Sequence, residues 1–295
     1  MNEEYILFSK KGNKAKIIYN DSFEIIIKSF KIEYYVSGKA YLILDIKRQN
    51  SENVQSISKI EFKGETDEGF VFEIDITEDF NENPFYLNFF CPVPKRIQLI
   101  KPFTLKSNKE QPKKLKQYFT NFLFDYNSTN TNGFLIKIEN KNFCFKKPIR
   151  YKENKKIIEK TNIPKITGYM ESEIVDDYDK QKNISRNIFE LVSYSQRQFI
   201  QVVYDELVNQ KNEVVKIIIH PQVLRPARAG FTVVESNLLY EQDQTIIKFI
   251  EETYVKYIEW KEKIKLDYSL TYYFLAFIPK QGEVEYILVF TAVES

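Results

Sequence analysis

Short apolar runs separated by turn-forming clusters dominate the first half of this chain. Phe70, Phe72 and Ile74 alternate with Val71, Glu73 and Asp75, and this period of two gives a strand one buried face. Ten strands packed into about half of the chain favour an antiparallel β-sandwich-like domain over a single open sheet. The predicted strands, between residues 5 and 149, are EYILFS, KAKIIYN, SFEIIIKSFKI, AYLILDIKR, SISKIEFKG, GFVFEIDIT, FYLNFFCP, RIQLIKPFTL, GFLIKIEN and NFCFKKPI.

One stretch interrupts the strands. In residues 112–126, Leu115, Tyr118, Phe119 and Phe122 recur at helical spacing, which predicts a short helix. The polar stretch NSTNTN that follows is a loop by composition. Residues 151–165 form a charge run without a clear period, so we place a domain boundary there, between domains 1–160 and 161–295.

The second domain mixes strands and helices. TGYMESEIV reads as a strand, and a helix is predicted for residues 182–193. QFIQVVYDELVNQ and EVVKIIIH then predict an antiparallel hairpin around NQKNE, although the first segment also fits a continuation of the helix.

The C-terminal region has the longest helical pattern. Ile247, Ile250, Tyr254, Tyr257 and Ile258 share one face of a helix predicted for residues 243–264. A second helix is expected from Asp267 to Pro279, and a third from Glu283 to Ser295. The third has no capping residue, so we expect it to pack on this helix pair or to open a further domain. The predicted class is therefore α+β, with a β-sandwich-like domain followed by a smaller, mainly helical one.

Composition excludes several functions. The chain has 295 residues and a net charge of +2, so no overall charge attracts nucleic acid or membranes. Its only histidine, His220, does not suffice for a zinc site or a catalytic relay, and its 8 glycines form no nucleotide-binding loop. We therefore expect no metal, no cofactor and no catalytic residues.

The two cysteines and the N-terminal sequence indicate the cellular compartment of the protein. Cys91 and Cys144 fit no metal spacing and read as free thiols. The chain begins without a signal-peptide pattern and has no long apolar run, which predicts a cytoplasmic protein without membrane contact. Whether it forms a homo-oligomer is left open.

Charge clusters supply the candidate binding residues. Residues 101–117 and 146–160 are both strongly basic, and if they share a face with Tyr118 and Tyr151 they suit a phosphate backbone. The alternative is a solubilising surface. The proline-rich loop PQVLRPARAG, at residues 221–230, contains Arg225 and Arg228. Paired guanidinium groups suit the binding of phosphate or carboxylate. The candidate ligand-binding residues are Lys113, Lys114, Lys146, Lys147, Arg150, Arg225 and Arg228.

Three short motifs resemble the N-terminal region of ApeA-type bacterial HEPN proteins. They are LVSYS at residues 191–195, YYFLA at 272–276 and TAVES at 291–295, with Thr167-Gly168-Tyr169 as a looser match. In that family a β-rich module precedes these helices and leads into a HEPN domain.

The resemblance implies a role in anti-phage defence by abortive infection, with the HEPN domain acting as a ribonuclease. That activity uses an arginine and a histidine separated by four to six residues, but Glu213, Val214 and Val215 occupy the positions with those spacings before His220. We therefore expect a non-catalytic recognition module, as a truncated product, a split-gene subunit or a fragment. It would bind a phage-derived protein or nucleic acid and contact a HEPN effector through its C-terminal helix.

Two other functions fit the sequence. A β-sandwich rich in aromatic residues suits a carbohydrate-binding or virion-associated structural module. A metal-dependent nuclease acting through Asp45-Ile46-Lys47 or Glu61-Phe62-Lys63 is a third reading, although such triplets arise readily in a highly charged chain.

Overall fold

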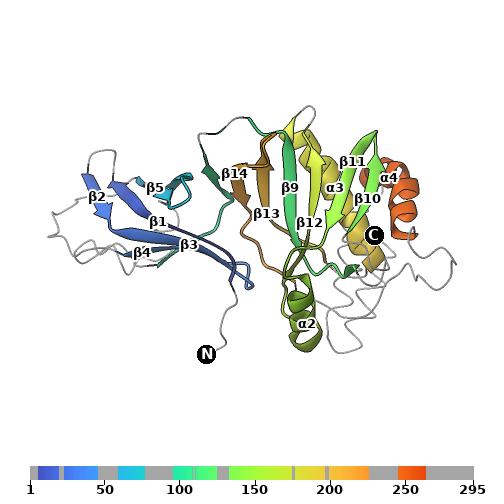
Figure 1. Cartoon of the computed structure of the whole chain (residues 1–295), viewed down its shortest axis with the longest axis horizontal. Coiled ribbons are helices and arrows are strands. Elements are labelled where there is room, and N and C mark those ends of the chain that lie inside the picture. Colours follow the sequence, from blue (N-terminus) through green and yellow to red (C-terminus); the bar gives the residue numbers. More distant parts are fainter. Residues whose placement is uncertain are drawn as a thin grey trace. The chain divides into compact units, whose positions relative to one another are not determined.

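A computed structural model of the chain describes residues 6–19, 23–45, 59–76, 96–107, 109, 111–124, 133–174, 177–196, 199–225 and 245–263. These residues form mostly antiparallel sheet with three helices (Figure 1), which confirms the predicted α+β class. The chain divides into two compact units. The first comprises Met1–Pro112 and Val203–Leu224, and the second comprises Lys113–Val202 and Arg225–Ser295.

This division differs from the sequence-based domains 1–160 and 161–295. The predicted hairpin is present, but it forms part of the first unit because its second strand pairs with a strand of that unit, Ile217 opposite Leu105. Residues 113–160 belong to the second unit. A local pattern cannot show such long-range strand pairing, which decides where the chain divides.

The first unit is built from antiparallel strands. Their order is β13-β14-β8-β6-β5-β1-β3-β4-β7, with β2 also paired to β1. This confirms the β-rich, sandwich-like character predicted for the N-terminal region. The strands are β1 (Ile6–Tyr19), β2 (Phe23–Ile27), β3 (Ser29–Tyr35), β4 (Ala40–Asp45), β5 (Ile60–Thr66), β6 (Val71–Asp75), β7 (Arg96–Leu99), β8 (Phe103–Lys106), β13 (Val202–Val208) and β14 (Val214–Ile219).

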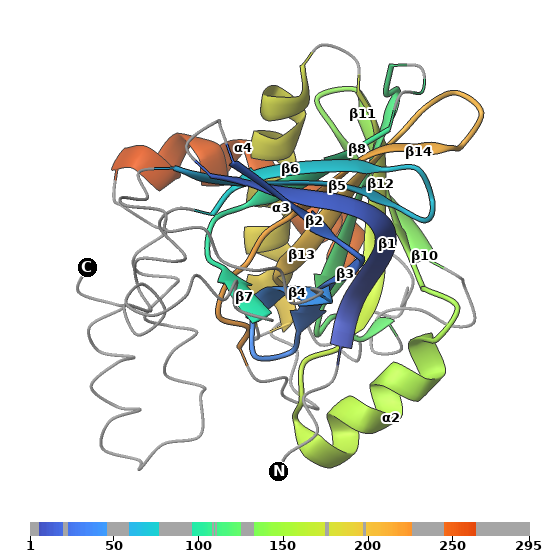
Figure 2. The ribbon, with the colours of Figure 1, turned by 90° about the vertical axis from the view of Figure 1, so that its left-hand side faces the viewer.

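Strand β1 bends, and Figure 2 shows it curving through the first unit. Its first half pairs with β3 and its second half with β2, and the change occurs just after Gly12. A Cβ at Gly12 would lie 2.2 Å from the Glu65 carbonyl oxygen and 2.5 Å from the Phe30 ring. Glycine is therefore required where the strand passes from one partner to the other.

Several strand boundaries differ from the prediction. EYILFS and KAKIIYN form the single strand β1, because the intervening KKGN bends without leaving the sheet. SFEIIIKSFKI divides into β2 and β3, and RIQLIKPFTL divides into β7 and β8 around Pro102. The predicted strand FYLNFFCP and the loop NSTNTN lie outside the described residues.

The second unit contains four antiparallel strands in the order β10-β11-β12-β9. They are accompanied by three described helices. The strands are β9 (Lys114–Thr120), β10 (Gly133–Ile138), β11 (Lys141–Lys146) and β12 (Ile166–Glu173), and the helices are α2 (Tyr151–Thr161), α3 (Tyr178–Gln196) and α4 (Thr245–Lys263).

The helix predicted within residues 112–126 was wrong, because Lys114–Thr120 is strand β9. Leu115 and Phe119 are both buried and lie four apart, so they satisfy a helical period and a period of two equally well. Pairing with β12, in which Met170 lies opposite Gln117, selects the strand. Most of the charge run in which we placed the domain boundary forms α2, which buries Tyr151 and Ile158.

Helices α3 and α4 confirm the remaining helical predictions in part. α3 is longer than expected and buries Ile184, Ile188, Leu191 and Val192 as predicted. On α4, Ile250, Tyr254 and Tyr257 are buried, whereas Ile258 is 38% exposed and Ile246 is buried instead. The helices predicted after Asp267 and Glu283 lie outside the described residues.

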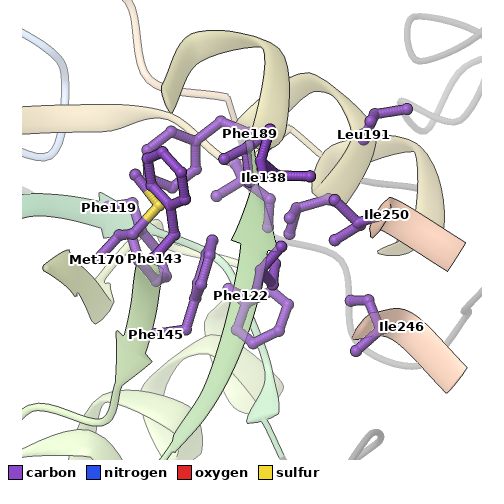
Figure 3. Close-up of a cluster of buried hydrophobic side chains, with 14 of the residues drawn as sticks. Phe119, Phe122, Ile138, Phe143, Phe145, Met170, Phe189, Leu191, Ile246 and Ile250 are labelled. Atoms are coloured by element: carbon purple, nitrogen blue, oxygen red, sulfur yellow. The ribbon is translucent and has the colours of Figure 1, made fainter. Parts of the chain in front are cut away.

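An aromatic core joins the sheet of the second unit to these two helices. The Phe119 ring lies 5.3 Å from that of Phe189 on α3 and 5.6 Å from that of Phe145 on β11, measured between centroids. Figure 3 shows these rings in one cluster with Ile246 and Ile250 of α4. Fully buried phenylalanines of this kind contribute strongly to folding, so the cluster fixes α3 and α4 on one face of the sheet.

Polar contacts also position α4. The Tyr257 hydroxyl donates to the Glu190 carboxylate of α3 over 2.5 Å, and the Lys261 ammonium also contacts Glu190. At the other side of the helix, the Glu251 carboxylate accepts a hydrogen bond of 2.7 Å from the backbone N–H of Lys137 on β10. α4 therefore satisfies a backbone donor of the edge strand as well as covering the core.

We predict that Gly168→Ala destabilises the protein by about 1–3 kcal/mol, the usual effect of overpacking a core. The added Cβ would lie 2.3 Å from the Phe119 ring and 3.0 Å from the Phe124 ring. Urea denaturation followed by circular dichroism measures the change. Asn142→Ala, at an exposed position of β11, is the matched control and should leave the midpoint nearly unchanged. An unchanged midpoint for Gly168→Ala would contradict this packing.

Candidate functional site

The sheet of the second unit has one face buried against helices and a second, more polar face. Along β9, Leu115, Gln117 and Phe119 are buried, whereas the alternate residues are only half-buried. Strand register extends the second face over the neighbouring strands, because directly paired residues lie on the same side. We call this surface the open face, and it consists of Lys114, Lys116, Tyr118, Leu135, Lys137, Asn142, Cys144, Lys146, Tyr169, Glu171 and Glu173.

The open face brings the two basic stretches of the sequence together. Glu171 lies on β12 between them, and its carboxylate oxygens are 3.9 Å from the Lys114 ammonium and 3.3 Å from the Lys146 ammonium. Lys114 comes from residues 101–117 and Lys146 from residues 146–160. Half-exposed ion pairs of this kind add little to stability, but they hold both ammonium groups beside the same strand.

Two tyrosines lie beside these lysines. Tyr118 and Tyr169 are directly paired across β9 and β12, with ring centroids 5.4 Å apart and a 31° angle between the planes. The Lys116 ammonium is 6.0 Å from the centre of the Tyr169 ring, and Lys146 is paired with Tyr169 from the other side. Tyrosine rings between lysines form an amphipathic surface that combines stacking with positive charge.

Cys144 reports on the electrostatics of this face. Partial burial raises the pKa of its thiol, Lys146 opposes that rise, and Glu171 and Glu173 add to it. The thiol is therefore more strongly protonated near neutral pH than an exposed cysteine, and its environment contains the same charges that a ligand would meet.

The other candidate residues lie apart from this group. Lys113 is exposed directly before β9, and Arg150 is exposed directly before α2. The Lys147 ammonium lies 5.2 Å from the centre of the buried Tyr151 ring and 5.8 Å from that of Phe124. Tyr151, which we expected beside the basic stretches, belongs to the core instead, and its hydroxyl accepts the Phe124 N–H.

The arginine loop is described only as far as Arg225. The backbone N–H of Arg225 donates to the side-chain oxygen of Gln201 over 2.7 Å, and the Arg225 carbonyl accepts from the side-chain amide of Asn121 over 3.1 Å. The guanidinium lies 5.5 Å from the Phe199 ring. Arg228 lies outside the described residues, so the structure does not test the paired arginine motif.

His220 and Glu61, two of the residues considered for catalysis, make ordinary structural contacts, whereas Ile46 and Lys47 lie outside the described residues. The His220 Nε2 is 2.9 Å from the carboxylate of the buried Asp205 in the first unit. Glu61 forms ion pairs with Lys59 and Lys63, as charged side chains along a strand commonly do. Among the described residues, no group of three or more His, Cys, Asp or Glu side chains could hold a metal ion.

We predict that charge changes on the open face alter the reactivity of Cys144 in opposite directions. Glu171→Gln removes a charge that raises the thiol pKa, so alkylation at a fixed pH becomes faster. Lys146→Ala removes a charge that lowers the pKa, so alkylation becomes slower. Iodoacetamide labelling followed by peptide mass spectrometry measures the rate at Cys144 alone. Lys16→Ala, in an ion pair of the first unit, is the control, and equal rates in all variants would contradict the arrangement.

None of the helices in the described ranges combines the length and apolarity that crossing a membrane requires. Comparison of the chain with models of known protein families, with curated proteins and with solved structures returned no match.

Proposed function

We propose that this chain is a non-catalytic recognition module of a bacterial anti-phage defence system, and that the open face is its ligand-binding surface. The observation that carries the binding role is the meeting of Lys114, Lys116 and Lys146 with Tyr118 and Tyr169 on one face. Aromatic side chains and flexible cations gathered on one rigid sheet are typical of a recognition surface.

The defence role is supported by the motifs that resemble ApeA-type HEPN proteins. Leu191 and Val192 of the first motif are buried on α3, and Thr167-Gly168-Tyr169 lies on β12. On this proposal the ligand comes from an infecting phage. Its binding is passed to a HEPN ribonuclease in a partner protein or domain, through the region that follows α4. A non-catalytic role fits the single histidine, whose Nε2 already contacts Asp205.

The phage-plating efficiency of the native host tests this proposal. With the gene at its own locus, we expect deletion of the gene and the double change Tyr118→Ala/Tyr169→Ala to raise the plating of sensitive phages to the same level. Loss of the ligand surface should prevent the response, whereas the folded chain should persist at normal abundance on an immunoblot.

Tyr41→Ala is the matched control for this experiment. Tyr41 is a half-buried tyrosine on a strand of the first unit, and its ring contacts the Arg96 guanidinium at 3.7 Å. This variant should protect the host as well as the unaltered protein does. Full protection by the open-face double variant, or equal plating with and without the gene across a broad phage panel, would contradict the proposal.

A further inference from the structure

We infer that the open face binds single-stranded nucleic acid, with bases stacked on the Tyr118–Tyr169 pair and phosphates contacting Lys116 and Lys146. This inference rests on the proposed binding role of the open face and adds the chemistry of its ligand.

The tyrosines provide the stacking surface. Their rings lie 5.4 Å apart and are inclined by 31°, and aromatic pairs of this kind suit stacking with a planar base. Stacking tolerates any base, since every base has a π-face. Stacking also requires bases that are not already stacked in a duplex, which selects single strands.

The lysines lie where the phosphates of a stacked strand would pass. Lys146 is directly paired with Tyr169 on β11, and the Lys116 ammonium lies 6.0 Å from the same ring on the β9 side. Lys114 on β9 and Lys137 on β10 extend the positive charge over the same face. The lysines of the open face outnumber its two glutamates, so the surface favours an anionic ligand.

Glu171 has a definite place in this arrangement. Its carboxylate contacts Lys114 and Lys146 and so keeps the two ammonium groups on either side of β12. A phosphate that approaches either lysine competes with Glu171 for it. Glu171→Gln should therefore strengthen binding, because it removes the competing charge without removing either lysine.

The side chains of the open face vary in size. Four adjacent strands, β10-β11-β12-β9, carry short side chains such as Cys144 and Asn142 on the same face as the lysines and tyrosines. Gly133, opposite Lys146, has no side chain at all. A flexible strand can follow this sheet, whereas a duplex presents its phosphates and keeps its bases from the tyrosines. An acidic peptide would use the lysines alone, and a sugar would use the tyrosines alone.

Fluorescence anisotropy with labelled oligonucleotides of about 15 nucleotides tests the inference on the full chain, since known modules of this kind cover about 4–16 nucleotides. We expect oligo-uridine and oligo-thymidine to bind and a duplex of equal length to bind more weakly. Tyr118→Ala and Tyr169→Ala should each weaken binding about tenfold or more. Tyr118→Phe and Tyr169→Phe keep the ring and should retain binding, which separates lost stacking from lost folding.

The salt dependence of the affinity tests the role of the lysines independently of the tyrosines. Contacts from about three lysines predict that the logarithm of affinity falls with the logarithm of salt concentration with a slope of about −2. Lys116→Ala and Lys146→Ala should each reduce that slope by about 0.7. Tyr41→Ala and Lys16→Ala, in the first unit, are the matched controls and should change neither affinity nor slope. The ratio of the affinities for oligo-uridine and oligo-thymidine shows whether the open face prefers RNA or DNA.

Two outcomes would overturn the inference. Absence of oligonucleotide binding by the unaltered chain at low salt would do so. So would binding to which the open-face tyrosines and lysines contribute no more than Tyr41 and Lys16. If the chain binds no oligonucleotide but Tyr118→Ala/Tyr169→Ala still abolishes phage protection, the nucleic-acid inference fails while the proposed recognition role stands. If oligonucleotides bind but the gene gives no protection, the proposed defence role fails while the nucleic-acid inference stands.

Discussion

The aromatic core on one side of the second sheet is the constraint on which the rest depends. Phe119, Phe145 and Met170 from the sheet pack with Phe189 of α3 and Ile250 of α4. Because these large side chains must be covered, both helices are fixed on that face. The opposite face can then carry charged and half-buried aromatic residues with little effect on the free energy of unfolding. Those residues are the ones that suit a ligand.

Alternation in the sequence predicted much of the fold. The ββ-hairpin around NQKNE, the strand TGYMESEIV and the helices α3 and α4 all follow from local periodicity. Strand β9 did not, because Leu115 and Phe119 fit both periods and only pairing with β12 distinguishes them. The division into units likewise depends on β14 pairing with β8, a contact between distant segments that no local pattern contains.

Only part of the candidate site could be predicted from the sequence. Charge clustering identified Lys114 and Lys146, and both lie on the open face. Tyr169 was missed as a binding residue, since it lies outside both basic stretches, and it joins Tyr118 only through the register of β12 with β9. Tyr151 was chosen because it follows a basic run, yet its ring is needed in the core. Proximity in sequence thus identifies the charges, and strand pairing identifies the aromatic partners.

The central claim is that a single strand of nucleic acid lies across the open face, and photo-crosslinking tests it most directly. An oligonucleotide that contains 4-thiouridine or 5-bromouracil would be irradiated with the full chain, and the attached peptides identified by mass spectrometry. The account predicts crosslinks at Tyr118 and Tyr169, within β9 and β12, that disappear when unlabelled single strand is added in excess. Crosslinks confined to the first unit, or distributed without preference over the chain, would contradict it.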